Sequence, residues 1–403
     1  MAEIAPRVPI RTLWSNARSE RNYDQAAVIA DQIFARNPQD DFVRRGTARL
    51  LEALARPEEA AVHWRALRDA NSSDFEAAFH CARAEMARGM KIADAVVRAA
   101  PDAGAVFQGA LVDALLHPAP ALEGEFKHVA IAGVSFCGST LLDRVLGGLP
   151  GVKSTGESHW ITKVHADNRY CEIDMSVPLA DAKFVPCTVC GAGCEVLSRS
   201  FRRSLAADNT NWYRKIAQRH STQVLVSADK GLRNLLDKDP LLDLSALVVF
   251  KSPEQAWRSQ LNKLPVGKDR DYYDAECAKY VSVWAKNYRT FLDHFKPQGT
   301  VAFLNFDAFT KSPETLLRAV CARLELAFDP GVLHRTVPGH AIGGNGGSMK
   351  RLRANDYGVV IEQLPDPALE PAHQAIIADS TAMQQTWCEL MSRHRMLENH
   401  ANA

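Results

Sequence analysis

The stretch HVAIAGVSFCGSTLLDRVLGGLPG, residues 128–151, decides the fold of the larger part of this chain. In it an apolar strand runs into a loop of small residues, and the loop leads directly into an amphipathic helix. Gly133 and Gly138 have the spacing of loops whose backbone N–H groups surround phosphate oxygens at a helix N-terminus. The hydroxyl donors beside them are Ser135, Ser139 and Thr140. We therefore expect an anion site here, with a joint kept small only for packing as the alternative.

The residue after the second glycine is Ser139, where the phosphate loops of ATPases and GTPases carry a lysine. That lysine makes the main contact to the β- and γ-phosphates. Its replacement argues against hydrolysis of a nucleoside triphosphate and against a nucleotide kinase. The expected ligand is another phosphorylated molecule.

Short apolar strands alternate with helical segments in the rest of the chain, which predicts an α/β fold with a parallel sheet and crossover helices. The expected strands are residues 128–133, 223–228, 246–250 and 300–306. Ligands of such folds bind beyond the carboxyl ends of the strands. Residues that directly follow a strand are therefore the first functional candidates.

Lys251 closes one of these strands, and Ser259 lies two helical turns further along the chain. Pro253 suits the first turn of the helix between them. A cation and a hydroxyl brought together at a strand end would form a second phosphate site, separate from the glycine loop. A solvated lysine without a ligand is the alternative.

These motifs, in this order, resemble those of sulfotransferases that use 3′-phosphoadenosine 5′-phosphosulfate (PAPS), and among them the bacterial and tyrosylprotein-sulfotransferase-like branch. The resemblance covers residues from about 127 to 355. GVSFCGSTLL is similar to the family's 5′-phosphosulfate loop, and FKSPEQAWRSQ is similar to its 3′-phosphate motif. LPGVKSTGESHW and VSADKGLRNLL resemble its glycine–glutamate and Asp-Lys segments. LNFDAFTKSPETLLRAVCARLEL and GHAIGGNGGSMKRLR resemble its Tyr-Glu-Asp-Leu helix region and the loop that covers the nucleotide.

The resemblance implies a P-loop-like sulfotransferase fold and in-line transfer of a sulfuryl group from PAPS to an acceptor hydroxyl, leaving the product PAP. It assigns Glu157 as the general base that removes the acceptor's proton, with His159 as the second candidate. Lys230 is the candidate cation at the transferring group. A helix-terminal carboxylate and a solvent-facing histidine are the ordinary alternatives for the first two residues.

Two departures from the family pattern concern charge. Phe136 or Cys137 stands where the loop usually carries an arginine or a lysine, so charge neutralisation falls to Lys230. Lys251 replaces the usual arginine, which gives up a bidentate contact and keeps a point charge. We expect weaker nucleotide binding as a result. The nucleotide-binding residues that the resemblance implies are Ser135, Phe136, Cys137, Gly138, Ser139, Thr140, Leu141, Lys251, Ser259, His340, Gly344, Asn345, Ser348, Lys350 and Arg351.

The expected partner is a hydroxyl-bearing acceptor, with a glycan or polysaccharide preferred over protein tyrosine or a small metabolite because a helical extension suggests a large molecule. The alternative from another class is a binding module, in which an inactive sulfotransferase-like domain serves a helical scaffold. The retained Glu157, Lys230, Lys251 and Ser259 favour the enzyme.

Residues 1–117 have a different character, with few β-branched runs and small and bulky residues at helical spacing. Residues 22–38 and 56–72 place Ala26 and Ala60 thirty-four residues apart at equivalent points, which resembles a tetratricopeptide array. Residues 75–101 are expected to form a third, shortened unit, and a protein partner for these repeats is expected. A plain helical bundle is the alternative. Residues 118–126 are the predicted linker, and 127–403 the sulfotransferase domain.

Cysteines cluster in an insertion at about residues 171–195 of that domain. Cys187, Cys190 and Cys194 follow Cys171, and four sulfurs could close a tetrahedral structural zinc site. Unligated thiols and a transient redox pair are the alternatives. Sulfuryl transfer needs no metal, so the cluster is not expected to be catalytic.

Composition narrows the classes of partner. The chain has 403 residues, of which 46% are hydrophobic and 24% charged, and its net charge of +1 gives no overall attraction to nucleic acid or to an anionic membrane. No segment has a signal peptide's apolar core or the length of a membrane span. With nine unevenly spaced cysteines, these features predict a cytoplasmic protein with reduced thiols.

Overall fold

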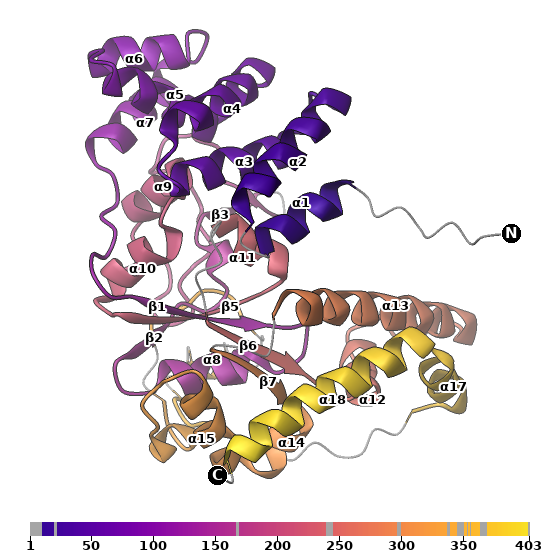
Figure 1. Cartoon of the computed structure of the whole chain (residues 1–403). Helices are drawn as coiled ribbons and strands as arrows, with labels where there is room; N and C mark the ends of the chain where they lie inside the picture. Colours follow the sequence, from indigo (N-terminus) through magenta and orange to yellow (C-terminus); the bar gives the residue numbers. More distant parts are fainter. Residues whose placement is uncertain are drawn as a thin grey trace, which may run out of the picture.

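The structure is a computed structural model. It describes residues 10–19, 22–166, 169–238, 245–295, 300–336, 339–344, 350–352, 354, 356–362 and 369–401. Figure 1 shows a layered α/β region with a helical region stacked against one side of it. Among the described residues, no helix combines the length and the apolar character that crossing a bilayer requires.

The N-terminal region consists of antiparallel helices: α1 (Ile10–Ser19), α2 (Tyr23–Arg36), α3 (Asp41–Ala53), α4 (Pro57–Ala70), α5 (Phe75–Ala87), α6 (Ile92–Ala99) and α7 (Ala105–Leu116). Helices α2 and α4 begin 34 residues apart, and so do α3 and α5. The repeating unit is thus a pair of helices, α2 with α3 and then α4 with α5. Residues 75–101 therefore span the second helix of one pair and the first helix of the next.

Capping residues mark the starts of these helices. Asn22, Asp40 and Asp74 each accept a hydrogen bond from a backbone N–H in the first turn of α2, α3 and α5. Pro57 occupies the first turn of α4, where its missing N–H costs nothing. Small residues at the crossings, including Ala26 and Ala60, are fully buried and let the helices approach closely.

The α/β region is built on a parallel sheet of five strands in the order β2-β5-β1-β6-β7. The strands are β1 (Lys127–Ala132), β2 (Val152–Ser154), β5 (Val224–Lys230), β6 (Ser245–Phe250) and β7 (Val301–Asn305). Four of them correspond to the four predicted strands, so the α/β class is confirmed. After β1 the chain forms β2 and β5 on one side of β1, and it then crosses to form β6 and β7 on the other side. The strand order therefore reverses direction at β1, and ligands of such sheets bind at the carboxyl end of the strand where this happens.

Helices cover both faces of the sheet (Figure 1). Along β1, Val129 and Ile131 face one apolar core and Ala130 and Ala132 face the other, as strand alternation requires. The first core is covered by α8 (Ser139–Gly147), α14 (Phe306–Lys311) and α15 (Pro313–Arg323). The second is covered by α10 (Trp212–His220), α12 (Pro253–Leu261), α13 (Arg270–His294) and α17 (Pro371–Asp379). The last helix, α18 (Thr381–Ala401), contributes to both cores.

The segment between β2 and α10 leaves the sheet and meets the N-terminal helices. It contains the 3₁₀ turn η1 (Ser158–Trp160), the antiparallel hairpin β3 (Lys163–Ala166) and β4 (Arg169–Glu172), and α9 (Arg199–Ala207). Met175 and Ala207 belong to the apolar core of the N-terminal helices. The remaining elements are α11 (Leu232–Lys238) and the 3₁₀ turn η2 (Pro330–Leu333).

The connection from α7 to β1 is hydrogen-bonded to α9 and α10. The Ala119 N–H donates to Ser204 Oγ at 2.9 Å, and the Leu122 N–H donates to the Arg214 carbonyl at 3.1 Å. The Arg214 guanidinium in turn donates to the Leu122 and Gly124 carbonyls. These bonds hold the residues of the predicted linker against the α/β region.

Candidate active site

The loop between β1 and α8 has the backbone of an anion cradle. Gly138 caps α8 with φ of 103°, a left-handed conformation that favours glycine, and a Cβ there would lie 2.2 Å from the Phe306 ring. Gly133 would place a Cβ 2.6 Å from the Val249 carbonyl oxygen. The first N–H groups of α8 have no partner within the helix, and the helix dipole adds positive charge at this end. This helix end therefore favours negative charge in the loop, as the sequence predicts.

Two predicted loop residues point inward instead. Cys137 is buried, and burial raises the pKa of its thiol. Ser139 directs both its backbone N–H and its hydroxyl to the Cys137 sulfur, and Ser139 is itself buried. Among the predicted hydroxyl donors, Ser135 is exposed and Thr140 lines a small cavity beside Glu157.

Phe136 stands at the position that lacks the family's cation, with φ of 67°. The ammonium of Lys263, which follows α12, lies 5.7 Å from the centre of the Phe136 ring. This contact is within the range of a cation–π interaction. A positive charge is thus present above the loop, although it comes from a residue far along the chain.

Glu157 and Lys230 form an ion pair at the carboxyl ends of β2 and β5. Lys230 Nζ lies 2.5 Å from Glu157 Oε1, and Trp160 Nε1 donates to Glu157 Oε2 at 2.8 Å. Lys230 has φ of 59°, a strained conformation for a residue with a side chain. The β1–β5 register shifts where Ala132 pairs with Lys230, which turns the end of β5. Both predicted residues therefore meet at the expected edge of the sheet.

Asp229 holds His159 beside this pair. Its carboxylate accepts hydrogen bonds from the His159 N–H and Nδ1, both at 3.0 Å, and from Ser158 Oγ at 2.5 Å. Tyr213 OH donates to the same carboxylate at 2.8 Å. Burial alone would raise the pKa of Asp229, but the bonds from His159 and Ser158 outweigh burial and lower the pKa to about 2. An ionised Asp229 fixes the His159 ring with Nδ1 bound and Nε2 turned away.

Lys251 and Ser259 meet on the other side of β1. Lys251 Nζ lies 3.1 Å from Ser259 Oγ, as the spacing predicts, and Lys251 is buried. Burial lowers the pKa of its ammonium, whereas the nearby Asp307 carboxylate acts in the opposite direction. Asp307 accepts a hydrogen bond from the Ser252 N–H at 2.7 Å, and Ser252 caps α12. Lys251 thus lies just before α12 and meets a hydroxyl from near the end of that helix, which is the arrangement expected of the second anion site.

A cavity of about 30 Å³ lies between α8 and the Glu157 segment, and Thr140, Asp143, Glu157 and Gly344 contribute to its lining. Asp143 is buried on α8 and accepts a hydrogen bond from Ser154 Oγ at 2.6 Å. Burial raises the pKa of this carboxyl to about 7, with the Glu157 charge acting in the same direction and the Ser154 bond opposing it. Glu157 therefore has a second carboxyl group as a neighbour, one that ionises at a much higher pH than an ordinary aspartate.

The residues predicted to cover the nucleotide fall in three places. Gly343 packs against Glu157, so that a Cβ there would lie 3.0 Å from the Glu157 Cβ, and Gly344 lines the small cavity. Arg351 Nε instead pairs with Asp356 Oδ2 at 2.6 Å, and Lys350 is exposed. Asn345 and Ser348 lie outside the described residues.

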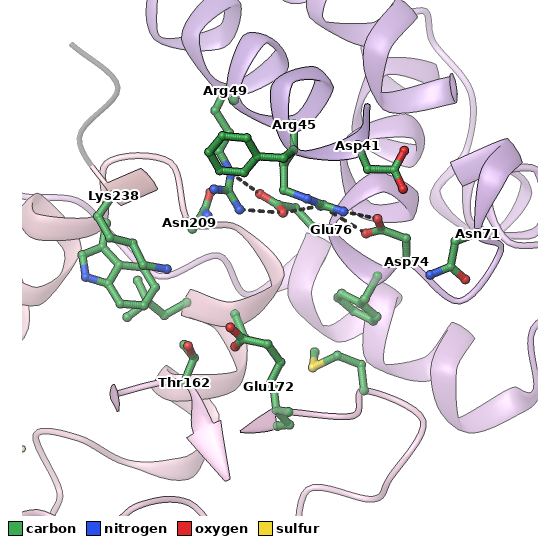
Figure 2. A pocket seen from close by; sticks show the side chains of 18 of the residues that line it. Asp41, Arg45, Arg49, Asn71, Asp74, Glu76, Thr162, Glu172, Asn209 and Lys238 are labelled. Carbon is green, nitrogen blue, oxygen red and sulfur yellow. Dashed lines mark hydrogen bonds and ion pairs between the residues drawn. The ribbon is translucent and has the colours of Figure 1, made fainter. Parts of the chain in front are cut away.

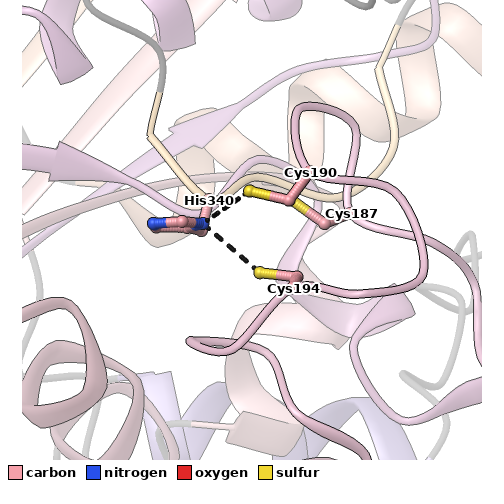
Figure 3. A group of neighbouring side chains, drawn as sticks. All are labelled: Cys187, Cys190, Cys194 and His340. Atoms are coloured by element: carbon pink, nitrogen blue, oxygen red, sulfur yellow. Dashed lines mark hydrogen bonds between the residues drawn. The ribbon is translucent and has the colours of Figure 1, made fainter.

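His340, predicted to bind nucleotide, lies against the cysteine insertion. Its Nδ1 is 3.2 Å from Cys190 Sγ and 3.3 Å from Cys194 Sγ (Figure 3). Cys187 completes a group whose ligand atoms all lie within 4.8 Å of one another. Cys171 is not part of this group: it is exposed on β4, and its sulfur faces the Val164 carbonyl oxygen.

A larger cavity of about 600 Å³ opens between the N-terminal helices and the α/β region. Figure 2 shows Arg45 and Arg49 of α3 paired with Asp74 and Glu76 at its upper wall. Burial would raise the pKa of Glu76, but the two guanidinium groups hold it well below its usual value. The opposite wall contains Trp212, whose Nε1 donates to Ser158 Oγ at 3.2 Å. The cavity therefore adjoins the segment that carries Glu157.

Comparison with known proteins gives distant structural likenesses, among them two bacterial sulfotransferases. No protein-family model matches the chain, and no curated protein matches it. A sulfotransferase from Alicyclobacillus acidocaldarius is 16% identical, with 65% of this chain and 100% of the other covered and a TM-score of 0.32. Sulfotransferase STF1 from Mycobacterium tuberculosis H37Rv is 10% identical, with 77% and 93% covered and a TM-score of 0.32. At these values the likenesses assign no activity to this chain.

Three side chains of this edge were given no role from the sequence. Asp229 was noted only as part of the segment VSADKGLRNLL, and its place near the end of a strand was the available signal. Asp143 has no such signal, because an acidic residue in an amphipathic helix is ordinarily solvated. Lys263 has no such signal either, because it is far from the loop in sequence and comes close to it only through the direction in which α12 runs.

Proposed function

We propose that this protein is a sulfotransferase that moves the sulfuryl group of PAPS to an acceptor hydroxyl, with Glu157 as the general base. One observation carries the proposal. The Glu157–Lys230 pair lies at the carboxyl end of the sheet on one side of the β1 loop, and the Lys251–Ser259 pair lies on the other side. An acid–base pair with two separate anion sites suits a donor that is phosphorylated at both its 5′ and its 3′ positions.

The loop and the lysine–serine pair would hold the two ends of the donor. Backbone N–H groups at the start of α8 would bind the 5′ phosphosulfate, and Lys251 with Ser259 would bind the 3′ phosphate. Bound PAPS supplies a sulfuryl group on a phosphate leaving group. The lining of the small cavity by Gly344 supports a role for the 340–351 segment in covering the nucleotide.

The residues around Glu157 suit removal of a proton from an acceptor. Lys230 neutralises Glu157 in the structure, and a sulfonate arriving at the loop would compete for the same ammonium. Lys230 would then stabilise negative charge that develops during transfer, while Glu157 would be released from the ion pair and could accept the acceptor's proton. His159 is the alternative base, because Asp229 binds its Nδ1 and leaves Nε2 to accept a proton.

The 600 Å³ cavity is the proposed acceptor site. Its walls combine aromatic side chains, including Trp212 and Phe75, with the guanidinium and carboxylate groups of Arg45 and Glu76. Sugar rings are bound by such combinations of apolar faces and charged hydrogen-bonding groups. We therefore prefer a glycan hydroxyl as acceptor, with helices α3 and α5 contributing part of the site. In this arrangement the domain at residues 1–117 is a tetratricopeptide-like acceptor-binding extension.

Labelled PAPS tests the function directly. Incubation with a cell extract separated into glycans, proteins and small molecules should label the glycan fraction. PAP should also raise the melting temperature more than AMP or ATP does, because it alone engages both anion sites. Equal shifts for PAP and AMP would contradict the donor assignment. Binding of PAP without transfer to any fraction would instead support an inactive nucleotide-binding module.

A further inference from the structure

Three cysteines and one histidine converge at the edge of the α/β region. Cys187, Cys190 and Cys194 have the C-x₂-C-x₃-C spacing of a metal-binding knuckle, and His340 reaches them from a segment about 150 residues further along the chain (Figure 3). Within the described part of the chain, no other group of His, Cys, Asp and Glu ligand atoms converges in this way. Three thiolates and one imidazole are a ligand set that selects zinc.

The positions of the ligand atoms favour a metal ion over hydrogen bonds. Neutral imidazole has a single lone pair on Nδ1, yet two sulfurs approach His340 Nδ1, at 3.2 and 3.3 Å. One lone pair cannot serve two thiol donors equally well. A tetrahedral site with Zn–S of about 2.3 Å and Zn–N of about 2.0 Å has sulfur–nitrogen separations of about 3.5 Å. The observed separations are close to that value.

The backbone of the knuckle also suits thiolate ligands. Cys187 and Gly191 exchange backbone hydrogen bonds at 3.2 and 3.0 Å, and Gly191 has φ of 70°. The N–H groups of Val189 and Cys190 donate to the Cys187 sulfur, and the Leu197 N–H donates to Cys194 Sγ at 3.4 Å. Such N–H groups stabilise sulfur that carries negative charge. Cys187 and Cys194 are buried, whereas Cys190 is exposed and gives an ion access from solvent.

We propose that Cys187, Cys190, Cys194 and His340 bind one Zn²⁺ ion, and that this ion fastens the 339–344 segment, which adjoins Glu157, to the cysteine knuckle at residues 187–194. Binding replaces the three thiol protons by coordinate bonds and releases them to solvent, with His340 bound as neutral imidazole. The set differs from the four cysteines that the sequence suggested, because His340 takes the place of Cys171.

Backbone bonds connect the proposed ion to the candidate active site. The Thr188 N–H donates to the Ala341 carbonyl at 2.8 Å. The Ile342 N–H donates at 3.0 Å to the carbonyl of Thr155, the residue that follows β2. The Glu157 N–H donates to the Ile342 carbonyl at 2.7 Å. The ion would thus join the cysteine knuckle to a short segment that is itself hydrogen-bonded to the backbone of Glu157.

Metal content of the full-length protein tests the site. Protein purified with zinc supplied should hold about one Zn²⁺ per chain, and Co²⁺ in its place should give the absorption of tetrahedral cobalt–thiolate bonds. His340→Ala and Cys190→Ser should weaken zinc binding by more than the roughly 10- to 100-fold typical of outer-shell changes. Cys171→Ser is the matched control and should keep the full zinc content and the same cobalt spectrum.

A second measurement covers variants that fail to fold. Removal of zinc from the wild-type protein should speed amide hydrogen exchange in residues 155–157 and 339–344, and added zinc should reverse the change. Wild-type protein that stays metal-free in excess zinc would overturn the proposal, as would equal loss of zinc in Cys171→Ser and Cys190→Ser. Neither readout depends on sulfuryl transfer, so the zinc site can be confirmed or rejected even if the protein does not transfer sulfuryl groups.

Discussion

The two halves of the sheet edge, on either side of β1, carry charge in different ways. On the β2–β5 half, the Glu157–Lys230 ion pair lies beside the Asp229–His159 pair, which also binds Ser158. On the β6–β7 half, the buried ammonium of Lys251 contacts the Ser259 hydroxyl, with the Asp307 carboxylate nearby. The first half holds the two candidate bases, Glu157 and His159, whereas the second holds a cation beside a hydroxyl.

This difference separates chemistry from binding. A carboxylate paired with an ammonium, and a histidine paired with a carboxylate, can each change protonation or partner during a reaction. A buried lysine beside a serine, at the start of a helix, gains most from an anion that replaces lost water contacts. Substitutions in the two halves should therefore affect different measurable quantities.

Glu157→Gln should give the largest effect of these variants. It tests most directly whether the β2–β5 half carries out the chemistry while the β6–β7 half binds the nucleotide. The amide keeps the size of the side chain but cannot take up the acceptor's proton, so transfer should slow by about 10²- to 10⁴-fold. PAP affinity should stay near the wild-type value. Single-turnover transfer and PAP calorimetry measure the two quantities.

Glu325→Gln is the matched control for this variant, since it removes another carboxylate paired with a lysine, Lys127, at the surface. It should change neither quantity. Wild-type transfer in Glu157→Gln would move the base to His159, and an equal loss of transfer and PAP affinity would contradict the separation itself.

Asp143→Asn tests how burial affects the carboxyl group that lies beside Glu157. The folded-state pKa of about 7 lies above the usual carboxyl value, so between about pH 4 and pH 7 folding requires Asp143 to take up a proton, and the free energy of unfolding falls as the pH rises. The asparagine removes that cost, which amounts to about 1.4 kcal/mol per pH unit in this range. The variant should be more stable than wild type at pH 8, with the difference shrinking toward pH 4. Urea unfolding at both pH values measures it, and a pH-independent difference would contradict the assigned pKa.

Lys251→Ala should mainly weaken binding. A hydrogen bond to a charged group contributes about 1.5–3 kcal/mol, so PAP affinity should fall by about 10- to 100-fold while AMP affinity changes little. Competition calorimetry with PAP and AMP gives the ratio. Lys279→Ala, at an exposed ion pair of α13, is the control. A similar loss for AMP would place Lys251 outside the 3′-phosphate site.

Lys263→Ala should give the smallest effect of these variants. It tests whether a side-chain cation contributes to anion binding at the loop between β1 and α8. An exposed charge near an anion contributes up to about 1 kcal/mol, so the donor KM should rise by up to about fivefold, and less at high salt. Steady-state kinetics at two salt concentrations measure the change. A KM that is unaffected at low salt would show that the loop relies on its backbone alone.

The sequence predicts the parts of this edge that depend on local pattern. Apolar runs predict four of the five strands, and the residues after them include Lys230 and Lys251, because parallel strands bring their carboxyl ends together. Strand β2 was not predicted, since three residues, Val152–Ser154, are too few to show alternation. The 34-residue spacing also predicts the starts of α2 and α4 in register, although it does not show which helices form a pair.

Contacts over long separations could not be predicted in this way. His340 lies close to Cys190 only because residues 339–344 run beside β2, which no local pattern shows. Asp143 is buried because β2 places Ser154 over it, and burial, not residue type, sets its pKa. These properties arise from the tertiary arrangement and not from the residues near them in sequence.

The central position of β1 has a consequence for synthesis of the chain on the ribosome. Both partners of β1 come much later, since β5 begins at Val224 and β6 at Ser245. At roughly 5–20 residues per second, this apolar strand waits about 6 to 24 s before its second neighbour has been made. Helices α1–α7, whose contacts are mostly local, can form during that interval. A nascent chain arrested before residue 224 should therefore present β1 to chaperones while its N-terminal helices already resist protease.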